Sequence, residues 1–205
     1  MTIRSAVLSS VVCLLLGLSA AGCGSGGNNG ATGSGGTGGG GSTGSTPLTA
    51  AQFGAKYKFS ATDLAGWAPA DPATDPTAYD VYNGGDELVA RLDGGDMYTP
   101  NGCRVAMFQD LVGPNSATNR AIAMDFVTAD KATAMFTYMQ QNGYSTSIAG
   151  YDGSTALGSS TLGGINVTAH FKASYFEVWL SGFADTTSAG AAAKLFLDVF
   201  KSKTN

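Results

Sequence analysis

Apolar residues alternate with polar ones in four segments of the chain. The first two segments, 103–111 and 122–126, are separated by turn residues at 113–116. The other two, 165–171 and 176–180, are separated by only a few residues. Alternation of this kind points successive side chains to opposite faces of a strand. The sequence therefore predicts two β-hairpins.

Each predicted hairpin is followed by an amphipathic helix. Thr128 is placed to cap a helix over 129–142, where apolar residues recur at helical spacing until Gly143 ends it. Ser188 is placed to cap a second helix that runs through Lys201. The apolar stripe expected on this second helix consists of Leu195, Phe196, Val199 and Phe200. Two ββα-like units predict an α+β fold in which helices pack on an antiparallel sheet.

Other segments give shorter predicted elements. Residues 49–52 have the spacing of a capping box, which predicts a short helix to about residue 57. Residues 77–92 carry apolar side chains at roughly helical spacing and are followed by a Gly pair, so a helix is expected there. A short strand is expected at 144–148, and the Gly- and Ser-rich segment 150–164 is expected to be a loop.

Residues 1–22 have the features of a secretory signal peptide. Arg4 precedes an apolar run from Ala6 to Leu18, and small residues follow up to Cys23. A basic start, a short apolar stretch and a small-residue cleavage site direct export and are then removed. The apolar run is shorter than the ~20 residues that a membrane-spanning helix needs. The sequence thus predicts an exported protein.

The residues around the expected cleavage site resemble a bacterial lipobox. Ala21, Gly22 and Cys23 match its pattern, and Ala20 stands where Leu is usual. The resemblance implies that Cys23 receives diacylglycerol and an acyl chain such as palmitate, which anchor the protein in a lipid bilayer. Gly24 differs from the Asp that retains some lipoproteins in the inner membrane, which implies the outer membrane if the cell has one. Cleavage after Ala21 by the ordinary signal peptidase is the alternative.

Cys23 and the residues after it form the predicted segment 23–46. Residues 24–46 contain 12 Gly, 10 Ser, Thr or Asn, one Ala and no charged residue. This composition cannot bury a core and predicts a disordered tether. A Gly-rich coil of this length spans about 25 Å on average. A tether directly after Cys23 favours the lipid anchor, and it leaves 47–205 as a single folded α+β domain.

Composition argues against several activities. A chain that starts at Cys23 has 10 basic and 15 acidic residues, hence a net charge of −5, and no basic stripe, so no nucleic-acid binding is expected. Cys13 leaves with the signal peptide, so Cys103 is the remaining thiol and is predicted to be buried rather than nucleophilic. His170 is expected on the solvated side of its strand. The sequence has no Gly-x-Ser-x-Gly motif for a serine hydrolase.

Acidic residues concentrate in one segment. Residues 63–96 hold eight of them against one basic residue, Arg91. Such a segment suits Ca²⁺, a cationic ligand or a basic partner. The candidate ligands are Asp80, Asp86, Glu87, Asp93 and Asp96. The alternative is ordinary turn formation, because several acids of the segment precede Pro or Gly. The spacing does not match the twelve-residue calcium loop, and no other cofactor is expected.

Residues 79–88, Tyr-Asp-Val-Tyr-Asn-Gly-Gly-Asp-Glu-Leu, resemble the Asn-Gly-Gly helix motif of an uncharacterised family of exported bacterial and archaeal proteins. In that family the motif follows a Gly-Trp pair, here Gly66-Trp67, and precedes a hairpin and a helix like the one containing 130–136. Asp86 departs from the small residue that is usual. The resemblance implies an exported α+β domain and implies no activity.

Together these features predict a membrane-anchored surface or periplasmic lipoprotein that acts as a non-catalytic binding or envelope-interaction module. Its expected partners are the bilayer, through Cys23, and an envelope ligand or protein. The alternative is an enzyme that uses carboxylates of residues 63–96. Two nearby carboxylates at a pocket, one with a raised pKa, favour the enzyme, whereas an aromatic-lined face favours the binder. Tyr175 and Trp179 share one strand face: they are expected in the core if helices cover both faces of the sheet, and they are the aromatic candidates for a binding face if one face is open.

Overall fold

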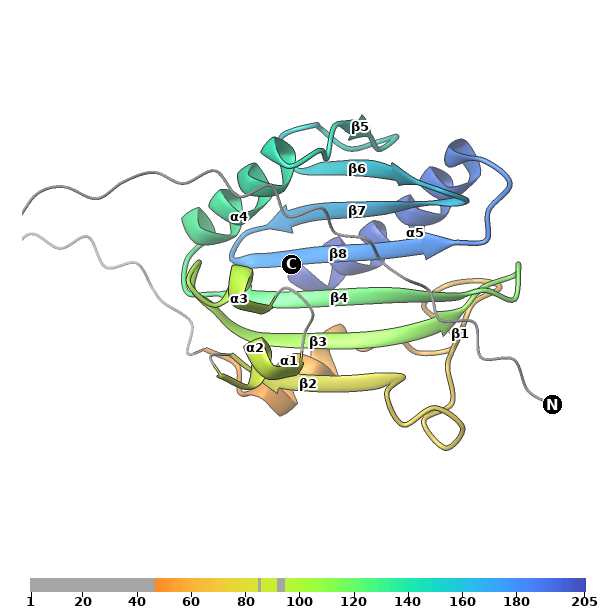
Figure 1. Cartoon of the computed structure of the whole chain (residues 1–205). Helices are drawn as coiled ribbons and strands as arrows, with labels where there is room; N and C mark the ends of the chain where they lie inside the picture. The colour runs from red at the N-terminus through yellow and green to blue at the C-terminus, as the bar shows by residue number, and fades with distance from the viewer. Residues whose placement is uncertain (1–46, 85, 92–94) are drawn as a thin grey trace, which may run out of the picture. The chain divides into compact units, whose positions relative to one another are not determined.

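The computed structural model describes residues 47–84, 86–91 and 95–205 (Figure 1). All strands in these ranges belong to one antiparallel sheet of eight strands, in the order β1-β3-β4-β8-β7-β6-β5. Strand β2 pairs with β3 next to β1, so the two short strands follow each other along the same edge. The strands are β1 (Ala68–Pro69), β2 (Tyr79–Asn83), β3 (Cys103–Val112), β4 (Thr118–Phe126), β5 (Thr146–Ser147), β6 (Ala156–Thr161), β7 (Gly164–Phe171) and β8 (Ser174–Ser181).

The two predicted hairpins form the centre of this sheet. Strands β3 and β4 make one, β7 and β8 make the other, and β4 pairs with β8 to join them. Each hairpin is followed by a helix, α4 (Ala129–Gln141) after the first and α5 (Thr186–Thr204) after the second. The predicted α+β fold, an antiparallel sheet of two ββα-like units with helices packed on it, is therefore confirmed.

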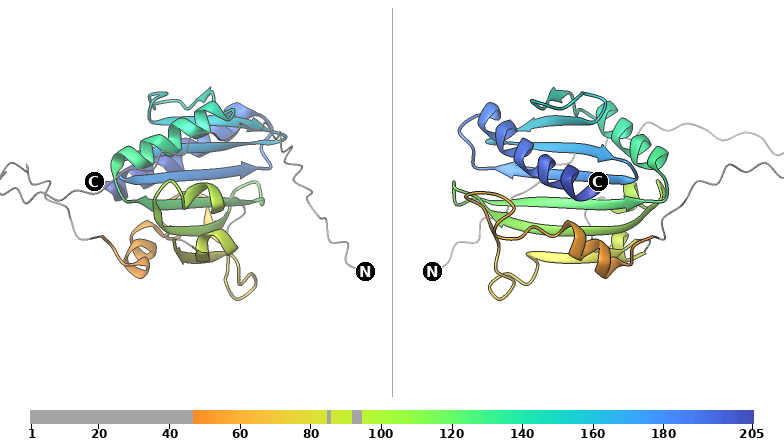
Figure 2. Two further views of the ribbon diagram at one scale, coloured as in Figure 1. Left: turned by 60° about the vertical axis from the view of Figure 1, so that its left-hand side comes forward. Right: turned by 180° about the vertical axis from the view of Figure 1, so that it is seen from behind.

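One face of the sheet is covered by α5 and by α1 (Ala50–Tyr57), as the view from behind shows (Figure 2). Aromatic rings fill the space between these helices and the strands. The rings of Phe176 and Phe200 stack with their centroids 4.4 Å apart, and Tyr57 meets Phe176 edge-on. Burial of these aromatic side chains and the contacts between their rings stabilise this side of the core.

The opposite face carries α4 and the short helices α2 (Asp86–Arg91) and α3 (Gly95–Tyr98). Its core gathers Met124 and Phe126 of β4, Tyr175 of β8 and the α4 side chains Met135 and Phe136. These helices lie over the half of the face nearest the end of β4 and the start of β8. The other half has no helix above it (Figure 1).

Helix capping follows the sequence at α1 and α4. The Thr49 side chain accepts a hydrogen bond from the Gln52 backbone, and the Gln52 side chain accepts one from the Thr49 backbone, which is the predicted capping box. Thr128 accepts from the backbone of Lys131 at the start of α4. The buried stripe of α4 is the predicted one, Ala132, Met135, Phe136 and Met139.

The predicted helix over 77–92 is wrong in its first half. Residues 79–83 form β2, which pairs in register with β3 from Tyr79 opposite Gln109 to Asn83 opposite Val105. Aromatic and β-branched residues in this stretch suit a strand, and pairing with β3 overrides the weak helical spacing. Only 86–91 is helical, while the expected end at Gly94 lies outside the described residues.

Two further predictions need correction. The expected loop 150–164 contains the strand β6. Gly158 is required in this strand because a Cβ at that position would lie 2.6 Å from the Cδ1 of Ile165. Helix α5 is capped by Asp185, which accepts from the Ser188 backbone at 2.7 Å, so Ser188 is not the cap. The predicted stripe of α5 is confirmed at Phe196 and Phe200, which are fully buried, but Leu195 is 47% exposed and Leu197 is buried instead.

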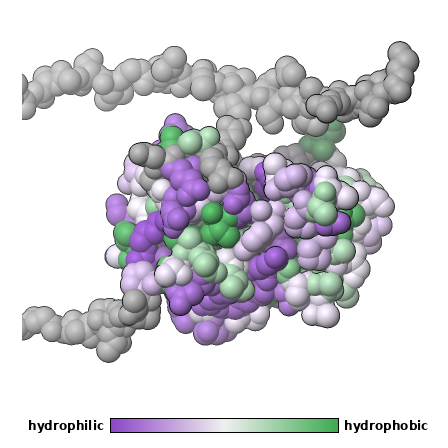
Figure 3. All heavy atoms as spheres, turned by 90° about the horizontal axis from the view of Figure 1, so that it is seen from below, coloured by the Kyte–Doolittle hydropathy of each residue, from purple (hydrophilic) through white to green (hydrophobic). Residues whose placement is uncertain are grey.

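The surface offers no broad apolar area at the β2 edge. Seen from this edge, hydrophilic residues are interspersed with weakly hydrophobic ones, and the strongly hydrophobic residues form small separate groups (Figure 3). No helix in the described ranges is long and apolar enough to span a membrane.

The packing at the start of β7 gives a first prediction. A Cβ on Gly164 would lie 1.8 Å from the carbonyl oxygen of Leu180, so Gly164→Ala must push β7 away from β8. We expect a loss of about 1–3 kcal/mol in the free energy of unfolding, measured by urea titration. Gly190→Ala in α5 is the control: nothing lies within 4 Å of its Cβ, and Ala favours a helix over Gly by about 1 kcal/mol. Equal stability of the two variants would contradict this packing.

Candidate ligand-binding site

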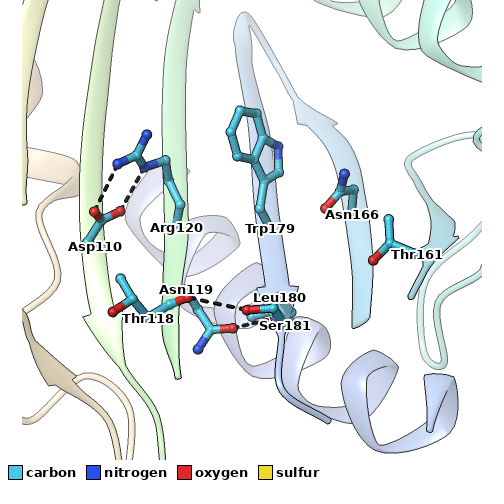
Figure 4. A pocket seen from close by; sticks show the side chains of 9 residues that line it. All are labelled: Asp110, Thr118, Asn119, Arg120, Thr161, Asn166, Trp179, Leu180 and Ser181. Atoms are coloured by element: carbon cyan, nitrogen blue, oxygen red, sulfur yellow. Dashed lines mark hydrogen bonds and ion pairs between the residues drawn. The ribbon is translucent and has the colours of Figure 1, made fainter. Parts of the chain in front are cut away.

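The half of the sheet face without a helix contains a cavity of about 300 Å³ (Figure 4). It crosses the ends of five strands, from β3 to β6, so its lining comes from both hairpins. The residues that line it are Asp110, Thr118, Asn119, Arg120, Thr161, Asn166, Trp179, Leu180 and Ser181. Most of these side chains are polar, and Trp179 provides the one aromatic surface among them.

An ion pair forms one wall of the cavity. Asp110 of β3 and Arg120 of β4 lie directly opposite each other in the hairpin. The Arg120 Nε and Nη2 donate to the two Asp110 carboxylate oxygens at 2.7 and 2.9 Å. This hydrogen bonding raises the pKa of Arg120, against the effect of burial. Because the pair is bidentate, it presents fixed donors and acceptors without net charge.

Trp179 stands between this pair and Asn166. The strand register places Arg120 on one side of Trp179 and Asn166 on the other, and the close-up shows the indole ring between them (Figure 4). The indole N–H donates to the Glu177 carboxylate at 2.9 Å. This hydrogen bond to Glu177, two residues earlier on β8, holds the indole ring in one orientation.

The remaining polar groups divide into fixed and available ones. Asn119 is fixed, because its Oδ1 accepts from the Ser181 backbone at 2.8 Å and its Nδ2 donates to the Ala117 carbonyl at 2.8 Å. The side chains of Asn166 and Thr161 make no hydrogen bond to another residue of the described ranges. A ligand in the cavity therefore finds the Asn166 amide next to the indole ring and the Thr161 hydroxyl beyond that amide (Figure 4).

Glu177 is the buried centre of a hydrogen-bond network below the cavity. Its Oε1 accepts from the hydroxyls of Tyr98 at 2.6 Å and Tyr175 at 3.0 Å, and its Oε2 accepts from Trp179. Thr168 in turn donates to the Tyr175 hydroxyl at 2.6 Å. Burial raises the pKa of Glu177, while the three donors act in the opposite direction.

This glutamate positions other groups and does not reach a ligand. It is 1% exposed, and it does not line the cavity. Both oxygens already accept hydrogen bonds from neighbouring side chains. A general acid or base needs direct or water-mediated contact with the reacting atoms. Through its hydrogen bonds with Tyr98 of α3 and with Trp179, Glu177 instead connects α3 to the indole ring that lines the cavity.

The acids predicted as ligands lie in different surroundings. Asp80 Oδ1 accepts from the Val81 backbone at 2.8 Å, and Glu87 Oε2 accepts from the Asn83 backbone at 3.0 Å. Asp96 is exposed in the first turn of α3. The Asp86 side chain and all of Asp93 lie outside the described residues. Among the residues that are described, no three His, Cys, Asp or Glu side chains gather to hold a metal ion.

Three other acids of the segment form turns, as the alternative expects. Asp71 and Asp75 accept hydrogen bonds from backbone N–H groups two residues further on, at 2.9 Å each. Asp63 accepts from the Ser60 backbone at 2.9 Å and pairs with Lys203 at 3.0 Å. These bonds lower the pKa of Asp63, although its partial burial acts to raise it. The acidic segment therefore supplies turn structure along the chain.

Cys103 and His170 do not form a catalytic pair. Cys103 is 5% exposed in β3, and burial raises the pKa of its thiol to about 12. The His170 ring nitrogens lie 2.9 Å from the Ser154 carbonyl and 3.4 Å from the Thr133 hydroxyl, and its ring packs against Phe136. His170 is half-buried rather than fully solvated, because α4 packs against β7 on this part of the face.

The sequence matches no protein-family model and no curated protein. Among solved structures, it is similar to the extracellular domain of PknH from Mycobacterium tuberculosis, with 15% identity and a TM-score of 0.47. The alignment covers 77% of this chain and all of that one. At this level the likeness supports no statement about ligand or activity, and the resemblance of residues 79–88 to an exported family stays a prediction.

Neither Glu177 nor the Asp110–Arg120 pair is among the site residues predicted from the sequence. A usable signal exists for Glu177, because Tyr175, Glu177 and Trp179 alternate along one strand and must share a face. A charged residue between two aromatics on a covered face requires donors nearby. The pair at 110 and 120 follows from the hairpin register once both strands are predicted.

The Glu177 network predicts a pH dependence of stability. Because the folded-state pKa lies above the ordinary value of 4.5, protonated Glu177 favours the fold below that pH. This stabilisation is lost as the pH rises through the folded pKa. Urea titrations from pH 4 upward should therefore show a decrease in unfolding free energy that is reduced in Glu177→Gln. Glu87→Gln, at the other glutamate, is the control, and identical profiles for all three proteins would refute the buried titration.

Proposed function

We propose that the protein is an exported, lipid-anchored, non-catalytic binding module whose ligand site is the cavity around Trp179. One observation supports this most: an indole ring is held upright between the Asp110–Arg120 pair and Asn166 in an open cavity. A fixed aromatic surface bordered by paired polar groups is the arrangement of a recognition site.

The chemistry of the cavity favours a neutral, polyhydroxylated ligand such as a sugar. The charges of Asp110 and Arg120 compensate each other, so the lining attracts neither anions nor cations strongly. A sugar ring has an apolar C–H face that packs on an indole, and hydroxyls that both donate and accept. Asn166 and Thr161 supply complementary donors and acceptors beside the ring.

The carboxylates near the cavity favour binding over catalysis. Asp110 accepts two hydrogen bonds from Arg120, and Glu177 is covered by the side chains that bond to it. An acid–base mechanism that relies on carboxylates requires at least one carboxyl group free to exchange a proton with the substrate. The alternative of an enzyme using acids of residues 63–96 gains no support from the described members of that segment, several of which form turns.

The proposed location rests on the sequence. The signal-peptide features of 1–22, the lipobox-like end at Cys23 and the tether to residue 46 support export and lipid anchoring. With a tether of about 25 Å mean length, the domain samples ligands in the envelope close to its membrane. Polysaccharides of the cell envelope are accordingly the class of partner that we propose.

The binding site is tested by tryptophan fluorescence. We expect chitotetraose or cellotetraose, titrated as probes, to change the emission of Trp67→Phe protein, in which Trp179 is the remaining tryptophan. Trp179→Ala should weaken binding by about tenfold or more, measured by calorimetry, because buried Trp contacts contribute strongly to affinity. Asn166→Ala should weaken it less. Unchanged affinity in Trp179→Ala refutes the site, and no binding of either oligosaccharide counts against a sugar of this type.

The anchor is tested separately. We expect Cys23→Ala to move the protein from the membrane fraction to the soluble exported fraction, because the acyl chains on Cys23 hold it at the bilayer. Cys103→Ala is the matched control and should remain membrane-bound, since that thiol is buried in β3. Retention of Cys23→Ala in the membrane would rule out anchoring through this residue.

A further inference from the structure

A second cavity, of about 450 Å³, lies on the other side of the molecule from the Trp179 site. It forms where α1, the end of α5, the β7–β8 turn and the ends of β3 and β4 meet. It is lined by Pro47, Leu48, Phe53, Lys56, Tyr57, Arg104, Asp125, Lys172, Ala173, Ser174, Thr204 and Asn205. Pro47 is where the predicted tether joins the domain, so the cavity opens beside that junction.

The cavity is positively charged although the protein as a whole is acidic. Lys56, Arg104 and Lys172 line it against a single acidic side chain, Asp125, whereas the chain carries a net charge of −4. The side chains that line the cavity thus carry a surplus of two positive charges. Such a surplus suits an anion better than a neutral or cationic ligand.

Arg104 has a buried donor, its Nε, without a hydrogen-bond partner among the described residues, while its Nη2 pairs with Asp125 at 2.5 Å. Because an unsatisfied buried donor is unfavourable, an incoming acceptor that pairs with this Nε is stabilised. Burial raises the pKa of the Asp125 carboxyl, against the lowering effects of Arg104 and Lys56.

Hydroxyl groups and a constrained turn complete the cavity. The Tyr57 hydroxyl lies 2.9 Å from the Ser174 Oγ, and both residues line the wall next to Arg104. Lys172 occupies the two-residue β7–β8 turn with φ +57°, a conformation that Asn or Gly adopts more easily. The Lys172 Nζ donates to the Thr204 carbonyl at 3.4 Å, so the ammonium group lies at the wall of the cavity.

We propose that this cavity binds a phosphate group, held by Arg104, Lys56 and Lys172 together with the hydroxyls. Guanidinium and ammonium groups converging with hydroxyl donors match the tetrahedral oxygens of a phosphate monoanion. The group is carried either by an anionic phospholipid headgroup or by a soluble phosphate. The cavity is bordered by Leu48, which is 38% exposed, and by the junction with the predicted tether. This part of the inference rests on the lipid anchor proposed above, which keeps the cavity close to the headgroups of the membrane.

Binding is measured with the full-length chain carrying Cys23→Ala, so that lipid attached to Cys23 does not contribute. The probes are inorganic phosphate, vesicles of phosphatidylglycerol and vesicles of phosphatidylcholine, at low ionic strength where screening is weak. We expect the double variant Lys56→Gln/Lys172→Gln to lose about tenfold or more in affinity for phosphate or for phosphatidylglycerol. The control double variant, Lys131→Gln/Lys201→Gln, removes the same charge outside the cavity and should bind as the parent does.

The outcomes separate the two sources. Binding of phosphatidylglycerol vesicles that requires Lys56 and Lys172, without binding of inorganic phosphate, supports the headgroup. Binding of inorganic phosphate with the same requirement supports a soluble phosphate. Equal losses of affinity in both double variants show general electrostatic attraction and overturn the proposal. Failure to bind both inorganic phosphate and phosphatidylglycerol vesicles also overturns it.

Asp125→Asn provides a gain-of-function test. It removes the carboxylate that competes for Arg104 and is expected to increase phosphate affinity several-fold. If Arg104 and Asp125 form only a structural pair, Asp125→Asn lowers thermal stability and leaves phosphate affinity unchanged. That second result also overturns the proposal.

Discussion

The pairing of β4 with β8 joins two hairpins that lie about fifty residues apart in the sequence. Its register is fixed because both faces of these strands are buried: Ala123 and Phe176 face one helix layer, while Met124 and Tyr175 face the other. A shift by one residue exchanges the two faces of a strand, which here places each set of side chains in the wrong core. The same register brings Arg120 beside Trp179, so the candidate site follows from core packing.

Much of the central sheet can be predicted from the sequence, whereas its edges cannot. The two hairpins and α4 have strong periodicity and recognisable caps, and these local signals agree with their environment. The sequence predicts a helix at the edge strand β2, since Tyr79 and Tyr82 satisfy helical spacing as well as strand pairing. It predicts a loop at β6 because Gly, Ser and Thr are common in loops. In both cases pairing with a neighbouring strand decides the structure, and a short window of sequence does not contain that neighbour.

The same distinction applies to the candidate site. Asp110 and Arg120 belong to one hairpin, and Glu177 lies two residues from Trp179 on one strand, so both contacts are within reach of a register argument. The bond from Tyr98 to Glu177 spans 79 residues and depends on where α3 packs, which no local pattern shows. The acidic segment is distinguished by its composition alone. Five of its acids accept hydrogen bonds from backbone N–H groups close in sequence, as short acidic side chains at turns commonly do.

The sheet keeps the two helix layers apart. Residues of the α1–α5 side and residues of the α4 side form separate clusters, and the backbone of the strands lies between them. Substitutions that are not in contact have nearly additive effects on stability. Selection can therefore change the side chains on the Trp179 face, and with them the ligand, while the aromatic packing under α5 stays the same. Homologues that diverge strongly on one face and little on the other are the evolutionary pattern that this architecture allows.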